Sequence, residues 1–148
     1  MHRSLLAYVA LCSLAGCVPP PGSPSLVQTP VTGDWTGTFD SSWGLLQVSA
    51  TLANEKYSQS IYGSFVLEGQ RATGTVGGAL QTHDTDTAGL FHGSLTISYP
   101  LANGEMCRST SGVTSGWATE RWIEFVTSGF TIGNCPNPPA NIRMTLRR

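Results

Sequence analysis

The chain has 148 residues and a formal net charge of −1, and only 11% of its residues are Asp, Glu, Lys or Arg, against about 25% in an ordinary soluble domain. Such a weakly charged chain lacks the positive surface that nucleic-acid binding requires. Its apolar fraction of 40% is too high for an intrinsically disordered tail. The length fits one domain, and the 17 glycines with recurring Ser and Thr favour an all-β domain with many turns.

The N-terminus has the pattern of an export signal. A basic start is followed by an apolar stretch from Leu5 to Gly16, which at about twelve residues is shorter than the ~20 that a membrane span needs. The stretch ends in Leu14-Ala15-Gly16-Cys17, a run that resembles the lipobox of bacterial lipoproteins. The resemblance implies that residues 1–16 are a signal peptide, and that Cys17 carries a diacylglycerol thioether and an amide-linked fatty acid such as palmitate. An ordinary secretory signal with a chance cysteine is the alternative.

Residues 17–32 are interpreted as the lipidated cysteine and a tether. The run Pro19-Pro20-Pro21-Gly22-Ser23-Pro24 favours extended polyproline structure, which acts as a semi-rigid spacer. Because several acyl chains hold a protein stably at a bilayer, we expect a protein of the cell envelope whose membrane contact is the lipid on Cys17. Val18 and not Asp follows the cysteine, a pattern that favours the outer membrane if the cell is Gram-negative.

Two cysteines remain in the domain that follows. Cys12 leaves with the signal and Cys17 is assigned to lipid, so Cys107 and Cys135 are expected to form a disulfide in an oxidising compartment. Closing a loop of nearly thirty residues stabilises the fold by roughly 3.5 kcal/mol on the chain-entropy model. A metal site is a weaker interpretation because there is no Cys-x-x-Cys pair and no histidine close to either cysteine in sequence.

Residues 33–148 form the expected domain, and its segments alternate apolar and polar residues as half-buried strands do. In Gly33–Phe39, for example, Trp35 and Phe39 share one face. The expected strands are residues 33–39, 45–52, 61–67, 72–80, 90–99, 106–119, 122–131 and 142–146. The segment 106–119 carries Ser, Thr and Gly on both faces, so its inward face cannot be assigned from the pattern.

Eight strands joined by short turns predict an antiparallel up-and-down meander. Closing it into an eight-stranded β-barrel would hide the apolar face and remove the edge strands. A two-sheet β-sandwich is the alternative. Glycines recur on the expected inner face, at Gly37, Gly63, Gly74, Gly78 and Gly93. These glycines favour the barrel, because strands in a small barrel coil sharply and glycine relieves crowding there.

Gly33-Asp34-Trp35, at the start of the first expected strand, resembles the Gly-x-Trp signature of the lipocalin and avidin superfamily, the calycins. The resemblance implies an up-and-down barrel in which this Trp closes one end and an Arg from near the last strand packs over it. Arg143, Arg147 and Arg148 lie in or after the last expected strand. By the alternation of that strand, Arg143 points outward. Bacterial lipocalins are themselves often lipoproteins.

The expected function is binding, and no catalytic constellation, cofactor motif or metal-binding motif occurs in the sequence. Trp35, Phe39, Phe65 and Phe91 are the residues expected to line or fill the barrel interior. An eight-stranded barrel either is filled by side chains or holds one small ligand. The lipocalin-like module is therefore expected to bind a small apolar molecule inside or an envelope component at its rim. An inhibitor of a protease or lysozyme, or a structural lipoprotein without a ligand, are the alternatives.

Overall fold

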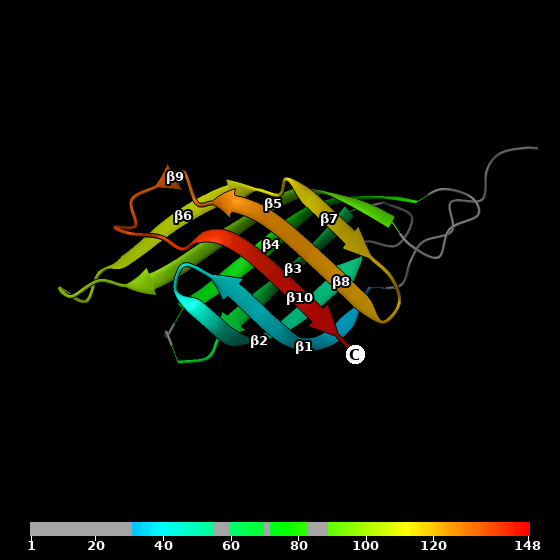
Figure 1. Ribbon diagram of the computed structural model, residues 1–148, viewed down its shortest axis with the longest axis horizontal. Coiled ribbons are helices and arrows are strands. Elements are labelled where there is room, and N and C mark those ends of the chain that lie inside the picture. Colours follow the sequence, from blue (N-terminus) through cyan, green and yellow to red (C-terminus); the bar gives the residue numbers. More distant parts are fainter. Residues whose placement is uncertain (1–30, 55–59, 70–71, 83–88) are drawn as a thin grey trace, which may run out of the picture.

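The computed structural model describes residues 31–54, 60–69, 72–82 and 89–148. All regular secondary structure in these ranges is β-strand (Figure 1). The described residues include no helix that could cross a bilayer. The strands are β1 (Gly33–Ser41), β2 (Gly44–Asn54), β3 (Ser60–Leu67), β4 (Ala72–Thr82), β5 (Gly89–Pro100), β6 (Met106–Gly112), β7 (Ser115–Ala118), β8 (Trp122–Gly129), β9 (Ile132–Gly133) and β10 (Ala140–Arg147). The signal, Cys17 and most of the expected tether lie outside the described residues.

The strands close into one barrel in which sequence neighbours are also neighbours in space. Every pairing is antiparallel, from β1 with β2 through β4 with β5 and on to β8 with β10. The last strand then pairs with the first, with Gly37 of β1 opposite Leu146 of β10. The prediction of an all-β, eight-stranded antiparallel up-and-down barrel is thereby confirmed, and the sandwich alternative is wrong.

The strand expected over residues 106–119 is broken into β6 and β7, which together make one barrel strand. The buried positions are Cys107, Ser109 and Ser111 in β6 but Gly116 and Ala118 in β7, so the inward parity changes between them. At the break, the amide of Val113 donates to Gly93 of β5 and that of Thr114 donates to Val126 of β8. The two-residue strand β9 pairs with β6 beyond the end of β8.

The core is the barrel interior, and the expected alternation places it correctly on the long strands. The inward faces carry large apolar side chains that are almost completely buried, among them Trp35, Leu52, Phe65, Phe91, Leu95, Ile123, Phe125, Ile142 and Leu146. The outward positions of the same strands are mostly polar, and Ser and Thr are the commonest residues there. Burying one apolar face in a closed sheet leaves no unpaired edge, which is the physical reason for this architecture.

Candidate functional site

The four aromatic residues expected inside the barrel all lie there. Trp35, Phe39, Phe65 and Phe91 are each at most 1% exposed. Glycines leave room for the rings of Phe65 and Phe91: a Cβ on Gly74, for example, would lie 2.1 Å from Phe65 Cζ, far inside van der Waals contact. Large rings therefore occupy the volume that missing side chains leave, as close-packed cores require.

Phe91 shows this packing most clearly. A Cβ on Gly78 would lie 2.7 Å from Phe91 Cζ, and one on Gly93 would lie 2.5 Å from the same atom. The Phe91 ring also meets Phe125 edge-on, with ring centroids 4.8 Å apart. The ring thus joins β4, β5 and β8 across the barrel, and at this level the interior is a packed core.

One end of the barrel is closed by Trp35 and the residues that lead into β1. The indole Nε1 of Trp35 donates to the carbonyl of Val31 at 2.8 Å, and the Val31 amide donates to Asn54 Oδ1 at 2.9 Å. The guanidinium of Arg148 lies 4.3 Å from the Trp35 ring centroid, and its Nη2 donates to the Thr32 carbonyl. Val31 and Thr32, which the sequence analysis assigned to the tether, are therefore bonded to this end of the barrel.

The arginine over the tryptophan is the feature that the calycin resemblance implied, and Arg148 supplies it. Arg143 faces outward, as the alternation predicted, and its Nη1 lies 3.8 Å from Glu124 Oε2. The described fold is thus consistent with a calycin-like barrel in both topology and the closing Trp–Arg pair.

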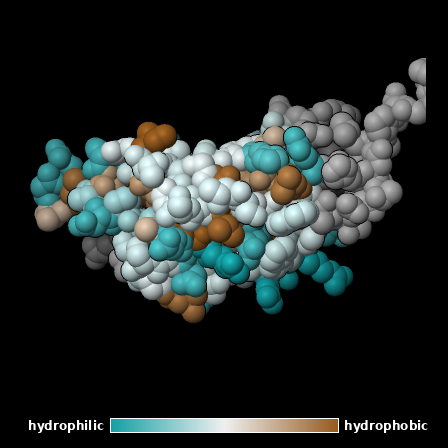
Figure 2. Space-filling view, turned by 45° about the horizontal axis from the view of Figure 1, so that its top comes forward, coloured by the Kyte–Doolittle hydropathy of each residue, from teal (hydrophilic) through white to brown (hydrophobic). Residues whose placement is uncertain are grey.

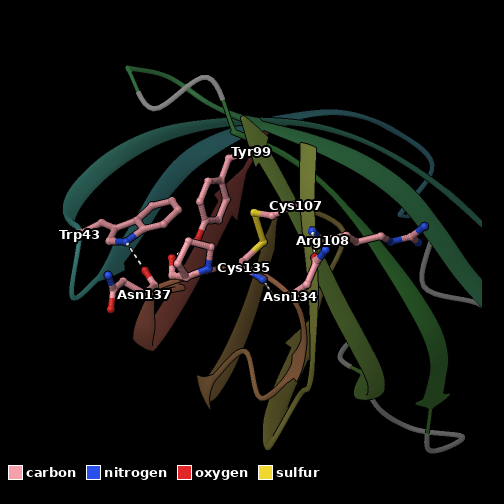
Figure 3. Close-up of a disulfide and its surroundings, with 9 residues drawn as sticks. Trp43, Tyr99, Cys107, Arg108, Asn134, Cys135 and Asn137 are labelled. Carbon is pink, nitrogen blue, oxygen red and sulfur yellow. Dashed lines mark hydrogen bonds between the residues drawn. A yellow bond between two sulfur atoms is a disulfide. The ribbon is translucent and has the colours of Figure 1, made fainter. Parts of the chain in front are cut away.

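The opposite end is closed by the segment 134–139, which the disulfide attaches to the inner face of β6 (Figure 3). The predicted bond between Cys107 and Cys135 is formed, and Cys107 is fully buried. Two aromatic side chains hold the same segment: Tyr99 donates its hydroxyl to the Pro136 carbonyl at 2.6 Å, and Trp43 Nε1 donates to the Asn137 carbonyl at 3.3 Å.

Trp43 and Tyr99 also contact each other edge-on, with centroids 5.1 Å apart. Partial burial raises the pKa of the Tyr99 phenol above its ordinary value of 10.0, because the phenolate would lose hydration at this position. The neutral hydroxyl is the form that can donate to Pro136. Together the disulfide and the two rings make a lid over this barrel end.

A buried polar seam runs along β6 and β8 inside the barrel. Ser109, Ser111 and Thr127 are at most 3% exposed. Ser111 and Thr127 share a hydroxyl–hydroxyl hydrogen bond, and the Ser109 hydroxyl accepts from the Cys135 amide at 3.2 Å. These hydroxyls have partners, so the seam is a satisfied part of the core. It also explains why hydrophobic alternation could not assign the inward face of residues 106–119.

Three hollows lie on the outer face of the sheet, where sequence reasoning had placed no site. The first, of about 200 Å³, is lined by Thr73, Thr75, Thr96, Ser98 and Arg108 around Gly74. The second, of about 230 Å³, lies over β1 to β3 and includes Asp34, Ser49, Thr51 and Ser64 among its lining residues. The third, of about 450 Å³, lies over β2 to β4 and includes Thr51, Tyr62, Ser64 and Thr75. The polar residues that alternate with the apolar ones along the strands were the sequence feature that could have indicated this surface.

The face of the barrel visible in Figure 2 is largely pale between the two ends, and its hydrophobic patches are separate from one another. Among the described residues, no group of three or more His, Cys, Asp or Glu side chains is placed to hold a metal ion. Comparison with family models, curated proteins and solved structures finds no match to this chain.

Proposed function

We propose that this chain is a lipid-anchored protein of the bacterial envelope whose barrel is a binding module that works through its outer surface. The observation that carries the proposal is the closure of the barrel. Trp35 and Arg148 close one end, the disulfide-held segment closes the other, and Phe91 and its neighbours pack the space between. A filled barrel supports the envelope-partner half of the expected function over a small apolar ligand held inside.

The anchor in this proposal is lipid on Cys17, which rests on the lipobox resemblance. The chain enters the barrel at Val31, beside Trp35. Residues 17–30 in polyproline form would span about 40 Å at ~3.1 Å per residue. The tether would therefore join the barrel at its Trp35 end, and the disulfide and Trp43 lie at the other end of the barrel.

A second candidate is an inhibitor of an envelope-directed enzyme, and one feature favours it. The segment 134–139 is attached to the barrel by a disulfide and by two side-chain hydrogen bonds to its carbonyls, and Asn137 in it is exposed. A preorganised exposed loop binds a cleft with little loss of conformational entropy. Substituting Asn137 would weaken such an inhibitor and would leave outer-face binding unchanged.

Two experiments test the proposed function. Cells grown with a clickable fatty acid should label the wild-type chain and the Cys12→Ser control but not Cys17→Ser, and equal labelling of all three would refute the anchor. Native mass spectrometry of the full-length protein purified from its host should give the mass of the acylated chain without a bound small molecule. A stoichiometric apolar ligand that survives purification would refute the filled-barrel argument.

A further inference from the structure

We propose that the outer-face hollows form one groove that binds an acidic glycan strand, with Tyr62 stacking on a sugar ring and Arg108 pairing with an anionic substituent. The inference rests on the proposed function in one respect, since it takes the outer surface as the working surface and names the class of ligand bound there. It is carried by the continuity of the hollows, by their hydroxyl lining and by the placement of these two side chains.

The three hollows are continuous. The hollow over β1 to β3 shares Thr51 and Ser64 with the hollow over β2 to β4, and the latter shares Thr75 with the hollow that Arg108 lines. Their outward residues also stand opposite one another across the strands, with Asp34 opposite Thr51, Thr51 opposite Ser64, and so on through Ser64, Thr75, Thr96 and Thr110. We call this continuous surface the hydroxyl groove.

The lining of the hydroxyl groove selects among classes of ligand. Each Ser or Thr hydroxyl offers one donor and two acceptor positions, which suits a ligand that is itself covered with hydroxyls. Thr51 already donates to Asp34 at 2.7 Å, and Thr96 shares a hydrogen bond of 2.9 Å with Thr110. Arg108 is the only cationic residue that lines the three hollows, so the groove does not suit a nucleic acid.

Tyr62 supplies an aromatic face at the side of the groove. It is 56% exposed and stands opposite Gly77 on β4, where an added Cβ would meet nothing within 4 Å. An exposed ring beside bare backbone has room for the C–H face of a pyranose, while its hydroxyl remains available for a polar contact. An exposed aromatic ring together with many neutral hydroxyls matches a sugar, which has an apolar C–H face and hydroxyl groups around its ring.

Arg108 supplies a positive charge in the first hollow, and its backbone is held in place. Two hydrogen bonds to Asn134 hold the Arg108 backbone. The Arg108 amide donates to Asn134 Oδ1 at 2.9 Å, and the Arg108 carbonyl accepts from the Asn134 amide at 3.1 Å. The disulfide joins the residues adjacent to this pair, Cys107 and Cys135. The side chain extends away from the disulfide (Figure 3), and it forms no ion pair with any described carboxylate. An exposed guanidinium without an ion-pair partner among the described residues suits a carboxylate, sulfate or phosphate group.

The distance between these two side chains favours a strand over a single sugar. Tyr62 and Arg108 are separated by three strand spacings and by four residues along β6, or about 20 Å across the surface at ~4.8 Å per strand and ~3.3 Å per residue. The acidic side chain Asp34 lines the far part of the groove. The anionic substituent is therefore expected at the Arg108 end.

The test is binding of the full-length protein in detergent to an array of neutral saccharides, uronic-acid, sulfated and phosphorylated saccharides, and peptidoglycan fragments. The wild-type chain should retain acidic glycans, and retention should fall as salt rises. Tyr62→Ala should reduce retention at least tenfold. Trp117→Ala, which removes an aromatic side chain of 46% exposure from β7 outside the groove, is the matched control and should bind as the wild type does.

The charge is tested in the same assay by Arg108→Gln, with Arg121→Gln as the control for loss of an exposed arginine. Arg108→Gln should weaken acidic glycans at least tenfold and should remove most of the salt dependence. Thermal unfolding within about 2 °C of wild type confirms that a variant is folded, since all four side chains are exposed and substitutions at such sites are usually worth less than ~0.5 kcal/mol.

Three results would overturn the inference: no acidic glycan retained, equal losses in Tyr62→Ala and Trp117→Ala, or polyglutamate bound as strongly as the acidic glycans. These outcomes are separable from failure of the proposed function. Fatty-acid labelling of Cys17 and the absence of an interior ligand can both hold while the array is negative, in which case the glycan groove alone is wrong.

Discussion

Replacing Phe91 by alanine tests the packed interior on which the proposed function depends. The side chain is 1% exposed, lies against Gly78 and Gly93, and contacts Phe125 edge-on. Neighbouring side chains cannot move in to fill the cavity left by the ring, because two of the groups that contact it are glycine backbone. Phe→Ala changes in well-packed cores cost about 3–5 kcal/mol, and we expect a value near 4 kcal/mol here. This corresponds to a fall in melting temperature of roughly 15 °C for a domain of this size.

Urea unfolding followed by tryptophan fluorescence measures the loss, and an unchanged m-value shows that the denatured state is not the cause. Val66→Ala, on the outer face of β3 with 49% exposure, is the control and should cost less than ~0.5 kcal/mol. The Phe91→Ala variant should also gain stability from benzene or xenon, because a dry apolar cavity binds such probes. A loss below about 1.5 kcal/mol with no effect of either probe would refute the packed-core reasoning and reopen the case for an interior ligand.

Three further predictions concern the closed ends. Replacing both Cys107 and Cys135 by serine should lower the free energy of unfolding by about 3.5 kcal/mol and should speed amide exchange in the segment 134–139; unchanged exchange there would contradict the lid. Arg148→Ala should cost about 1 kcal/mol through the lost cation–π contact, whereas Arg147→Ala, one position earlier and also exposed, should cost less. The pKa of Tyr99 is raised in the folded state, so the contribution of the Tyr99 phenol to stability is complete below pH 10.0 and is lost as the pH rises above 10.0. The urea midpoint of Tyr99→Phe should therefore lack the alkaline decline of the wild type. Identical pH profiles of the two midpoints would contradict this prediction.

The sequence was sufficient for the long strands because their two faces differ sharply in polarity. Trp35 and Phe39 alternate with Asp34 and Thr36, and this alternation places both rings of β1 inside the barrel. The same alternation predicted that Arg143 points outward, which left Arg147 and Arg148 as candidates for the arginine over Trp35. Only the packing shows that Arg148 is the residue that contacts Trp35.

The sequence was not sufficient where the interior is polar or where the site lies outside. Ser109 and Ser111 face inward while Thr110 faces outward, so the two faces of β6 hardly differ in hydrophobicity. The break near Val113 depends on which neighbouring strand each amide bonds to. The hydroxyl groove was missed for a different reason. Its residues come from several strands, and only the register of the closed barrel brings Ser64, Thr75 and Thr96 into one row.

The hydrogen bonds that hold Val31 and Thr32 at the Trp35 end have a mechanical consequence. A pull on the chain that precedes Val31 runs along β1, which is paired with β2 on one side from Gly33 to Ser41 and with β10 on the other from Thr36 to Asp40. Such a load shears the hydrogen bonds of both ladders together and does not open them one at a time. Under the proposed membrane anchor, β1 would bear the tension of the tether with a partner strand on each side, and Arg148 at the C-terminus is bonded to Thr32 at its entry point.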